Sequence, residues 1–323
     1  MVWEKKGLVF TPNRQRDWIQ SHAAVPIPVH LSNNEWRIFF GSRNRDNKTQ
    51  TGYIDVEITK KNEFNLLYIS REPVLKLGSA GLFDDSAAWA SSIVQVEKDL
   101  WHMYYIGWMQ GVSVPYIPSI GLAVSEDLEE WDKIHDAPIM GRDGLDPYGC
   151  ASMSVMMDET AHYPMALNFK MWYLSILDYN PLEKMYYYTI RCAASDDGVD
   201  WLKSDEVAIE LKTNETRIAR PCVIKDFAIL YRMWYCYATK YVPYRIGYAE
   251  SINGTTWTRK DDEGLDVSKD RDAWDSQMVC YPYVFEHRNK RFMLYNGNDY
   301  GRTGIGYAIA NFEHDKKLEL MKE

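Results

Sequence analysis

Short runs in which apolar and polar residues alternate dominate the chain, and they predict strands rather than helices. The clearest stretch covers 215–257, where four strand-like segments follow one another at 220–224, 231–237, 244–250 and up to Trp257. The second segment is rich in aromatic residues, which suit a pleated, half-buried surface. Asn253 and Gly254 tolerate positive φ and therefore favour a turn before the last segment. Four antiparallel strands in about 40 residues have the size of one propeller blade.

The same unit recurs along the chain. A serine stands six residues before a tryptophan at Ser125/Trp131, Ser195/Trp201 and Ser251/Trp257, each time after an aromatic strand and a small-residue strand. Segments 36–40 with 51–54, and 292–295 with 304–308, supply two further copies without this turn. A β-sandwich with similar hairpins is the alternative, but the shared register of the three turns disfavours it. We therefore predict an all-β chain, a single five-bladed β-propeller of four-stranded antiparallel blades over residues 1–323. Residues 7–10 are expected to close the ring against the last blade.

Composition and charge narrow the function. The chain has a net charge of −9, which argues against nucleic acid or an anionic membrane as a partner because both require a basic surface. It contains no run of 18 apolar residues, and its first residues lack the apolar core of a signal peptide. The five cysteines are odd in number and show no C-x-x-C spacing, which indicates reduced thiols. We expect a cytoplasmic protein.

Acidic residues precede most of the predicted inner strands. In a propeller these positions lie at the mouth of the central channel, so the acids are our candidates for catalysis: Asp84, Asp85, Glu215 and Asp275. Asp84 and Asp85 are neighbours, and in an extended segment only one of them faces the channel. Converging carboxyl groups are what glycosidic chemistry needs, one protonated as the acid and another ionised as base or nucleophile.

Further residues near the predicted mouth of the channel are our candidates for substrate binding. They comprise one histidine, three arginines, four aromatic residues and one more acid: His22, Arg43, Trp89, Asp146, Tyr148, Arg217, Arg220, Trp274 and Tyr281. The arginines would hold an anionic or hydroxyl-rich group, and the aromatic rings offer flat faces for a sugar. A long insertion at 108–116 is expected to shape the pocket.

Each candidate also has a structural interpretation. Asp residues before strands often make local turns, Glu215 and Arg217 can form a structural ion pair, and His22 can belong to the core. The sequence contains no phosphate-binding loop, no H-E-x-x-H and no G-x-S-x-G. We expect neither a cofactor nor a metal ion.

The Ser–Trp turns, the Met-Trp-Tyr strands and Tyr-x-Ile-Gly-Tyr-Ala at 244–249 together resemble the five-bladed propeller superfamily of glycoside hydrolases. That group includes family 43 arabinanases and xylosidases, family 32 and 68 fructosyl enzymes, and family 130 mannoside phosphorylases. The resemblance covers nearly the whole chain and implies a funnel-shaped central site with acidic residues from several blades. Asp84 or Asp85 matches the second-blade acid of family 43. At the first-blade position of the family 43 base, this chain has Ser21-His22-Ala23.

From these patterns we predict a carbohydrate-active enzyme of glycosidase type, with a carbohydrate or an activated sugar as its partner. The catalytic carboxyls would be Asp84 or Asp85 with Glu215, and Asp275 as a third acid. Two alternatives remain open. One is a non-hydrolytic sugar-modifying enzyme whose arginines bind phosphate or carboxylate, and the other is a non-catalytic propeller that binds a glycan. The oligomeric state does not follow from the sequence.

Overall fold

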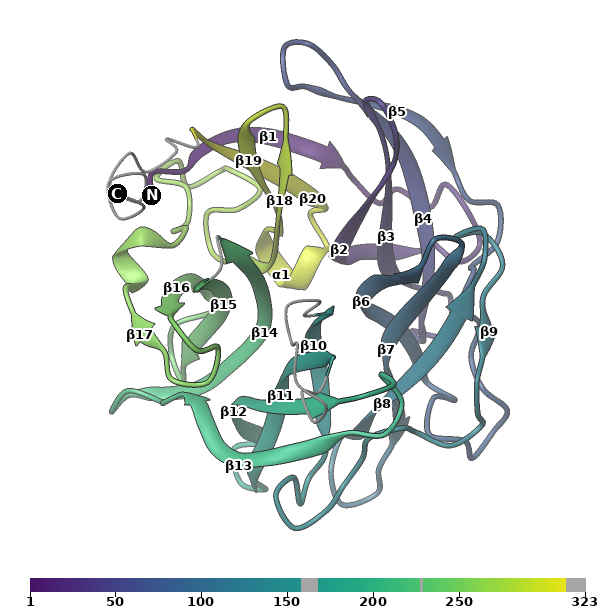
Figure 1. Cartoon of the computed structure of the whole chain (residues 1–323), viewed down its shortest axis with the longest axis vertical. Helices are drawn as coiled ribbons and strands as arrows, with labels where there is room; N and C mark the ends of the chain where they lie inside the picture. Colours follow the sequence, from purple (N-terminus) through teal and green to yellow (C-terminus); the bar gives the residue numbers. More distant parts are fainter. Residues whose placement is uncertain (158–167, 227–228, 312–323) are drawn as a thin grey trace.

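The computed structural model describes residues 1–157, 168–226 and 229–311, and almost all regular structure in these ranges is β (Figure 1). The exceptions are the four-residue helix α1 (Asn298–Gly301) and a 3-10 turn at Asp261–Glu263. No helix within the described ranges has the length and apolar character needed to cross a membrane. The all-β prediction is confirmed.

Consecutive strands pair antiparallel in sets of four. The first three sets are β2 (Ser21–Ser32), β3 (Glu35–Arg43), β4 (Thr49–Ile58) and β5 (Phe64–Ile69); β6 (Ala87–Glu97), β7 (Leu100–Gln110), β8 (Tyr116–Ser125) and β9 (Asp132–Lys133); and β10 (Cys150–Met157), β11 (Phe169–Asn180), β12 (Met185–Ser195) and β13 (Leu202–Ile209). The fourth set is β14 (Glu215–Asp226), β15 (Leu230–Thr239), β16 (Arg245–Ser251) and β17 (Thr258–Arg259).

The last set joins the two ends of the described chain. It contains β18 (Cys280–His287), β19 (Lys290–Asn296) and β20 (Ile305–Asn311), and β1 (Glu4–Phe10) adds the outer strand by pairing with β20. The pairing expected for residues 7–10 is thus confirmed. Short parallel contacts, β4 with β6 and β12 with β14, link neighbouring sets, so the described strands form three sheets.

The inner strand of each set, β2, β6, β10, β14 or β18, lies nearest the centre (Figure 1). Each of these strands has a register shift, a β-bulge, against its neighbour. Bulges bend a strand and redirect its side chains. At the bulges the backbone of Val25, Ser152 and Arg220 has positive φ. The side chains at this level therefore point where a regular strand would not place them.

The repeated Ser–Trp turns hold neighbouring sets together. In the turn at 251–257 the Ser251 hydroxyl accepts a hydrogen bond from the Gly254 amide at 2.9 Å, and Gly254 has a φ of 78°. The Gly254 carbonyl then accepts from the indole of Trp172 in β11, at 2.7 Å. The equivalent carbonyls of Leu128 and Gly198 accept from Arg37 in β3 and Tyr104 in β7. Each turn thus binds to the second strand of the preceding set.

The small residues of the third strands leave room for tyrosine rings. Tyr105 in β7 lies opposite Gly121 in β8, and a Cβ added at Gly121 would meet the Tyr105 ring at 2.3 Å. Gly121→Ala is therefore expected to lower the free energy of unfolding by about 1–3 kcal/mol, measured by urea denaturation. Gly144→Ala is the matched control, because no atom lies within 4 Å of an added Cβ there. Equal stability of the two variants would contradict the expectation.

Candidate functional site

Three of the predicted acids lie in one repeated arrangement. Each is a buried aspartate before an inner strand that accepts hydrogen bonds from a tyrosine of the second strand and a lysine of the outer strand. The sets are Asp84 with Tyr105 (3.0 Å) and Lys133 (2.5 Å), Asp146 with Tyr173 (3.2 Å) and Lys203 (2.5 Å), and Asp275 with Tyr295 (2.9 Å) and Lys5 (2.6 Å). No aspartate of the three is more than 1% exposed. These acids tie the inner, second and outer strands of a set together.

Glu215 and Asp85 are also engaged elsewhere. The Glu215 carboxylate binds the Arg259 guanidinium through two hydrogen bonds of 2.7 Å, and Asp85 accepts from the Gly81 amide and the Ser86 hydroxyl. The structure does not bring the predicted catalytic acids together. Their catalytic role stays a prediction that the geometry does not support, since glycosidic catalysis requires two carboxyl groups that face one open space.

Three further candidates lie apart from one another. Trp274 stacks on Tyr295 at 5.2 Å between ring centroids, and Tyr148 lines a separate cavity of about 310 Å³ together with Arg142. Arg220 is buried near the centre, where it donates to the carbonyls of Ser91 and Met153. These contacts neither support nor exclude a role in substrate binding, which stays a prediction for all three residues.

Four of the predicted residues do meet in one pocket. His22, Arg43, Trp89 and Tyr281 line a cavity of about 430 Å³, together with Ala24, Gly41, Asn47, Thr49, Trp108, Gln110, Pro115, Tyr116 and Tyr300. The lining residues come from β2, β3, β4, β6, β7, β8, β18 and α1, and from loops between them. Part of the insertion at 108–116 lines the pocket, as the sequence suggested. We call this cavity the central pocket.

Aromatic rings form the walls of the central pocket. Trp89 packs edge-to-face on Trp108, with centroids 5.7 Å apart, and on Tyr281 at 5.9 Å. Tyr116 lies against Trp108, and Tyr300 against Tyr281. The Trp89 indole is held by a hydrogen bond to the Ala24 carbonyl, and Gly41 leaves room for the ring, because a Cβ there would meet it at 2.3 Å. The position of the indole is therefore well determined.

His22 has a strained backbone and a buried ring. Its φ is 63°, in the left-handed region that non-glycine residues rarely adopt. Its Nδ1 lies 2.9 Å from the Ser21 hydroxyl, and the side chain is 4% exposed. Burial, and then the nearby Arg43 guanidinium, lower the pKa of His22 to about 4, although Asp299 opposes this. The imidazole is therefore neutral near pH 7.

A second group of polar residues borders the pocket at Arg217. Its guanidinium lies 5.4 Å from the centre of the Tyr244 ring and donates to the Thr239 carbonyl. The Tyr188 and Tyr244 hydroxyls form a hydrogen bond with each other, and burial raises the pKa of Tyr188 to about 12. The Tyr188 hydroxyl is therefore protonated near pH 7. Among the described residues no group of His, Cys, Asp and Glu is arranged to hold a metal ion.

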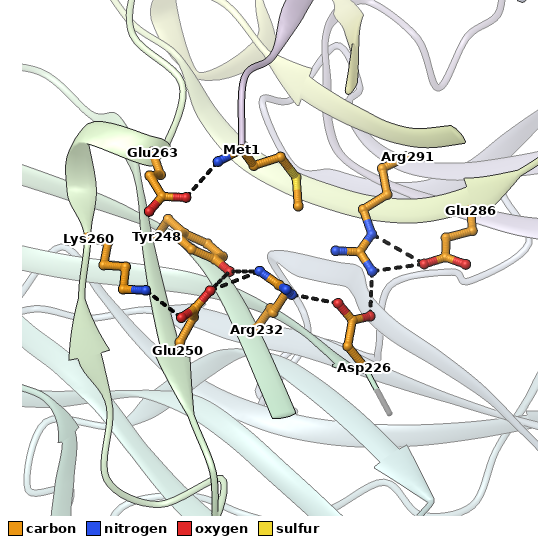
Figure 2. A network of polar contacts seen from close by, with 9 residues as sticks. All are labelled: Met1, Asp226, Arg232, Tyr248, Glu250, Lys260, Glu263, Glu286 and Arg291. Carbon is orange, nitrogen blue, oxygen red and sulfur yellow. Dashed lines mark hydrogen bonds and ion pairs between the residues drawn. The ribbon is translucent and has the colours of Figure 1, made fainter. Parts of the chain in front are cut away.

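A larger cavity of about 990 Å³ opens at the other ends of the strands, and Figure 2 shows the polar network beside it. Several of its charged groups take part in ion pairs. Arg232 binds Asp226 and Glu250, Arg291 binds Asp226 and Glu286, and Lys260 binds Glu250. This network connects the fourth and last sets of strands, because Asp226 of β14 binds Arg291 of β19. We therefore place the candidate site in the central pocket.

Sequence reasoning missed Tyr300, Asp299 and Arg302, which lie in or beside the central pocket. Asp299 and Tyr300 have positive φ in α1, and Asp299 pairs with Arg302 at 3.3 Å. The only signal was the turn-like Asn298-Asp299-Tyr300-Gly301 directly after an aromatic strand. It indicates a turn but not what the turn faces.

Two mycobacterial proteins are similar to the chain along almost its whole length. The uncharacterized protein MT1551 of Mycobacterium tuberculosis (strain CDC 1551 / Oshkosh) is 38% identical over 311 residues, 96% of this chain and 99% of its own length. The chain belongs to the family of this protein. The uncharacterized protein Rv1502 of Mycobacterium tuberculosis (strain ATCC 25618 / H37Rv) is also 38% identical to this chain over 311 residues, 96% of this chain and 99% of its own length. No model of a known protein family matches the chain.

Solved structures of glycoside hydrolases share the fold. One described as a glycoside hydrolase superimposes with a TM-score of 0.73 at 18% identity, covering 94% of this chain and 90% of its own. A family 130 protein from work on mannoside phosphorylases and β-1,2-mannosidic linkages gives 0.65 at 15% identity, covering 97% and 94%. A thermostable family 43 glycoside hydrolase gives 0.64 at 16%, covering 90% and 89%. The expected resemblance to this superfamily is confirmed at the level of the fold.

Proposed function

We propose that the chain is a five-bladed β-propeller whose central pocket binds a carbohydrate, and that each antiparallel set of four strands is one blade. The observation that carries the proposal is the group of aromatic faces at the centre, Trp89, Trp108 and Tyr281, beside polar groups of His22 and Arg43. A concave site with flat apolar walls and a few polar groups is typical of small-ligand pockets. The shared fold of glycoside hydrolases supports a sugar as the ligand.

The acids of the chain bear on whether the bound sugar would be hydrolysed. Within the described part of the chain no Asp or Glu lines the central pocket. Asp299 lies beside the pocket, close enough to raise the pKa of His22. This composition favours the non-hydrolytic sugar-modifying enzyme, or the glycan-binding propeller, over hydrolysis by two carboxyl groups. The five cysteines are free thiols, which supports the cytoplasmic location that we also propose.

Trp89→Ala is expected to weaken saccharide binding at least tenfold, because removing an aromatic anchor at the centre of a site commonly costs more than about 1.4 kcal/mol. Binding of a panel of mono- and oligosaccharides to wild type and variant would be measured by calorimetry. Tyr68→Ala is the matched control, an aromatic truncation on the outer strand β5 at a side chain that is 41% exposed. Failure of every saccharide to bind the wild-type protein would refute the proposal.

A further inference from the structure

Arg43 has no carboxylate partner in the described part of the chain, whereas three other arginines with little solvent exposure are each paired with an acid. Those pairs are Arg37 with Asp55 (2.8 Å), Arg232 with Asp226 (2.5 Å) and Arg259 with Glu215 (2.7 Å). Within residues 1–157, 168–226 and 229–311, Arg43 forms no ion pair and donates a side-chain hydrogen bond only to the Asn47 amide oxygen, at 3.2 Å. Burial lowers its pKa, the mark of a cation removed from water without full compensation. A guanidinium kept in a pocket under these conditions is ready to bind an anion.

The rest of the pocket is suited to a negative ligand. The side chains that line it include no acid in the described part of the chain. His22 is neutral and Asp299 is already paired with Arg302, so a bound anion meets little repulsion. The second nitrogen of His22, Nε2, has no hydrogen-bond partner among the described residues, because the one contact of the ring is made by Nδ1.

Arg217 adds a second cation at the border of the pocket. It lies near the side chains of Tyr188, Tyr244 and Tyr300, and its Nε has no hydrogen-bond partner within the described ranges. Its contacts are with a carbonyl and with phenol groups, none with a carboxylate of the described chain. Two guanidinium groups without carboxylate partners thus flank one set of aromatic walls, in a chain whose net charge is −9. The two arginines make the surroundings of the pocket positive, although the protein as a whole is negative.

We infer that the central pocket binds sugars through an anionic substituent, a carboxylate or a phosphate, held by Arg43. The inference rests on the proposed function, because it assigns the class of sugar that the same pocket takes. The guanidinium supplies paired N–H donors to the anion, the neutral imidazole lies beside it, and the rings of Trp89 and Tyr281 contact the sugar. Neutral sugars would make the aromatic contacts without a charge-assisted hydrogen bond to Arg43 and would bind more weakly.

The test compares ligands that share one ring and differ in charge. Glucose, glucuronate and glucose 1-phosphate are titrated at constant ionic strength into the wild-type chain. At least one of the two anionic sugars is expected to bind about 10- to 100-fold more tightly than glucose. The ratio between glucuronate and glucose 1-phosphate shows whether a carboxylate or a phosphate is preferred. Inorganic phosphate is titrated as well, and binding as tight as that of glucose 1-phosphate would overturn the inference in favour of a free anion.

Two variants separate this inference from the proposed function. Arg43→Gln is expected to weaken the binding of the anionic sugars about 10- to 100-fold more than the binding of glucose, and so to remove the preference. Arg45→Gln removes the same charge from an exposed side chain two residues further on, in the loop that follows β3, and should retain the preference. Glucose bound as tightly as both anionic sugars would overturn the anionic class while the sugar site stands. If neither the three sugars nor the saccharide panel binds, the proposed function fails with it.

Discussion

Lys203→Met is expected to lower the free energy of unfolding by about 3–5 kcal/mol, because it leaves a buried carboxylate without its cation. Asp146 is 0% exposed and binds Lys203 at 2.5 Å. The lysine also contacts Asp143 at 2.7 Å, so two acids would lose the same partner. The hydroxyl of Tyr173 remains as a donor to Asp146 but carries no charge. Urea denaturation of wild type and variant measures the loss.

A control and a rescue make this result specific. Lys212→Met breaks an exposed ion pair with Asp261, which keeps its contacts to Arg259 and Tyr235, and is expected to cost only about 0–1 kcal/mol. The double variant Lys203→Met with Asp146→Leu is expected to recover part of the loss, since it removes the unpaired charge. A cost below about 1 kcal/mol for Lys203→Met would show that Asp146 does not depend on its lysine.

The affinity for glucuronate is expected to rise as the pH falls from 8 towards 5, by up to about tenfold per pH unit. Burial and Arg43 hold the pKa of His22 at about 4 in the free protein. A carboxylate bound beside the ring favours the imidazolium, so the pKa of His22 is higher in the complex. The complex then takes up a proton, and proton uptake strengthens binding at lower pH. The ligand does not titrate in this range, because a carboxyl of this kind ionises below pH 4.

His22→Asn is the matched variant for this measurement, because asparagine tolerates the positive φ of the position better than most residues. The pH dependence is expected to disappear in it. The other charged groups near the ring are Arg43, Asp299 and Arg302, and an unchanged pH dependence in His22→Asn would show that His22 is not its source. An affinity that is constant from pH 8 to 5 in the wild type would contradict the proton uptake.

The repeated elements of the fold were predictable because they depend on neighbours in sequence. The Ser251 hydroxyl and the Gly254 amide are three residues apart, so the turn can be recognised from the residues themselves. The alternation of residues predicted the strands for the same reason. The pairing of β1 with β20 was instead expected from the way in which a propeller closes its ring. The pattern did not show which side chains the turns bind. The Gly254 carbonyl, for example, accepts a hydrogen bond from Trp172, which is 82 residues away in sequence.

The contacts of the acids depend on distant partners. Asp84, Asp146 and Asp275 each precede an inner strand, so the sequence shows at which end of the strand they lie. It does not show which group their carboxyl groups bind. The lysines that bind these three acids are 49, 57 and 270 residues away in sequence. Charge pairs over such separations leave no local pattern, so an aspartate in a structural ion pair and one in an open site look the same in the sequence.

The sequence by itself determined the strands, their turns, the superfamily of the fold and four residues of the central pocket, His22, Arg43, Trp89 and Tyr281. Only the tertiary structure decided that these four meet while the predicted acids do not. The reason is physical: bulges in the inner strands turn the side chains, and segments remote in sequence bring the rest of the pocket, including Tyr300 of α1. A pocket made from so many strands is a property of their packing, which no single segment encodes.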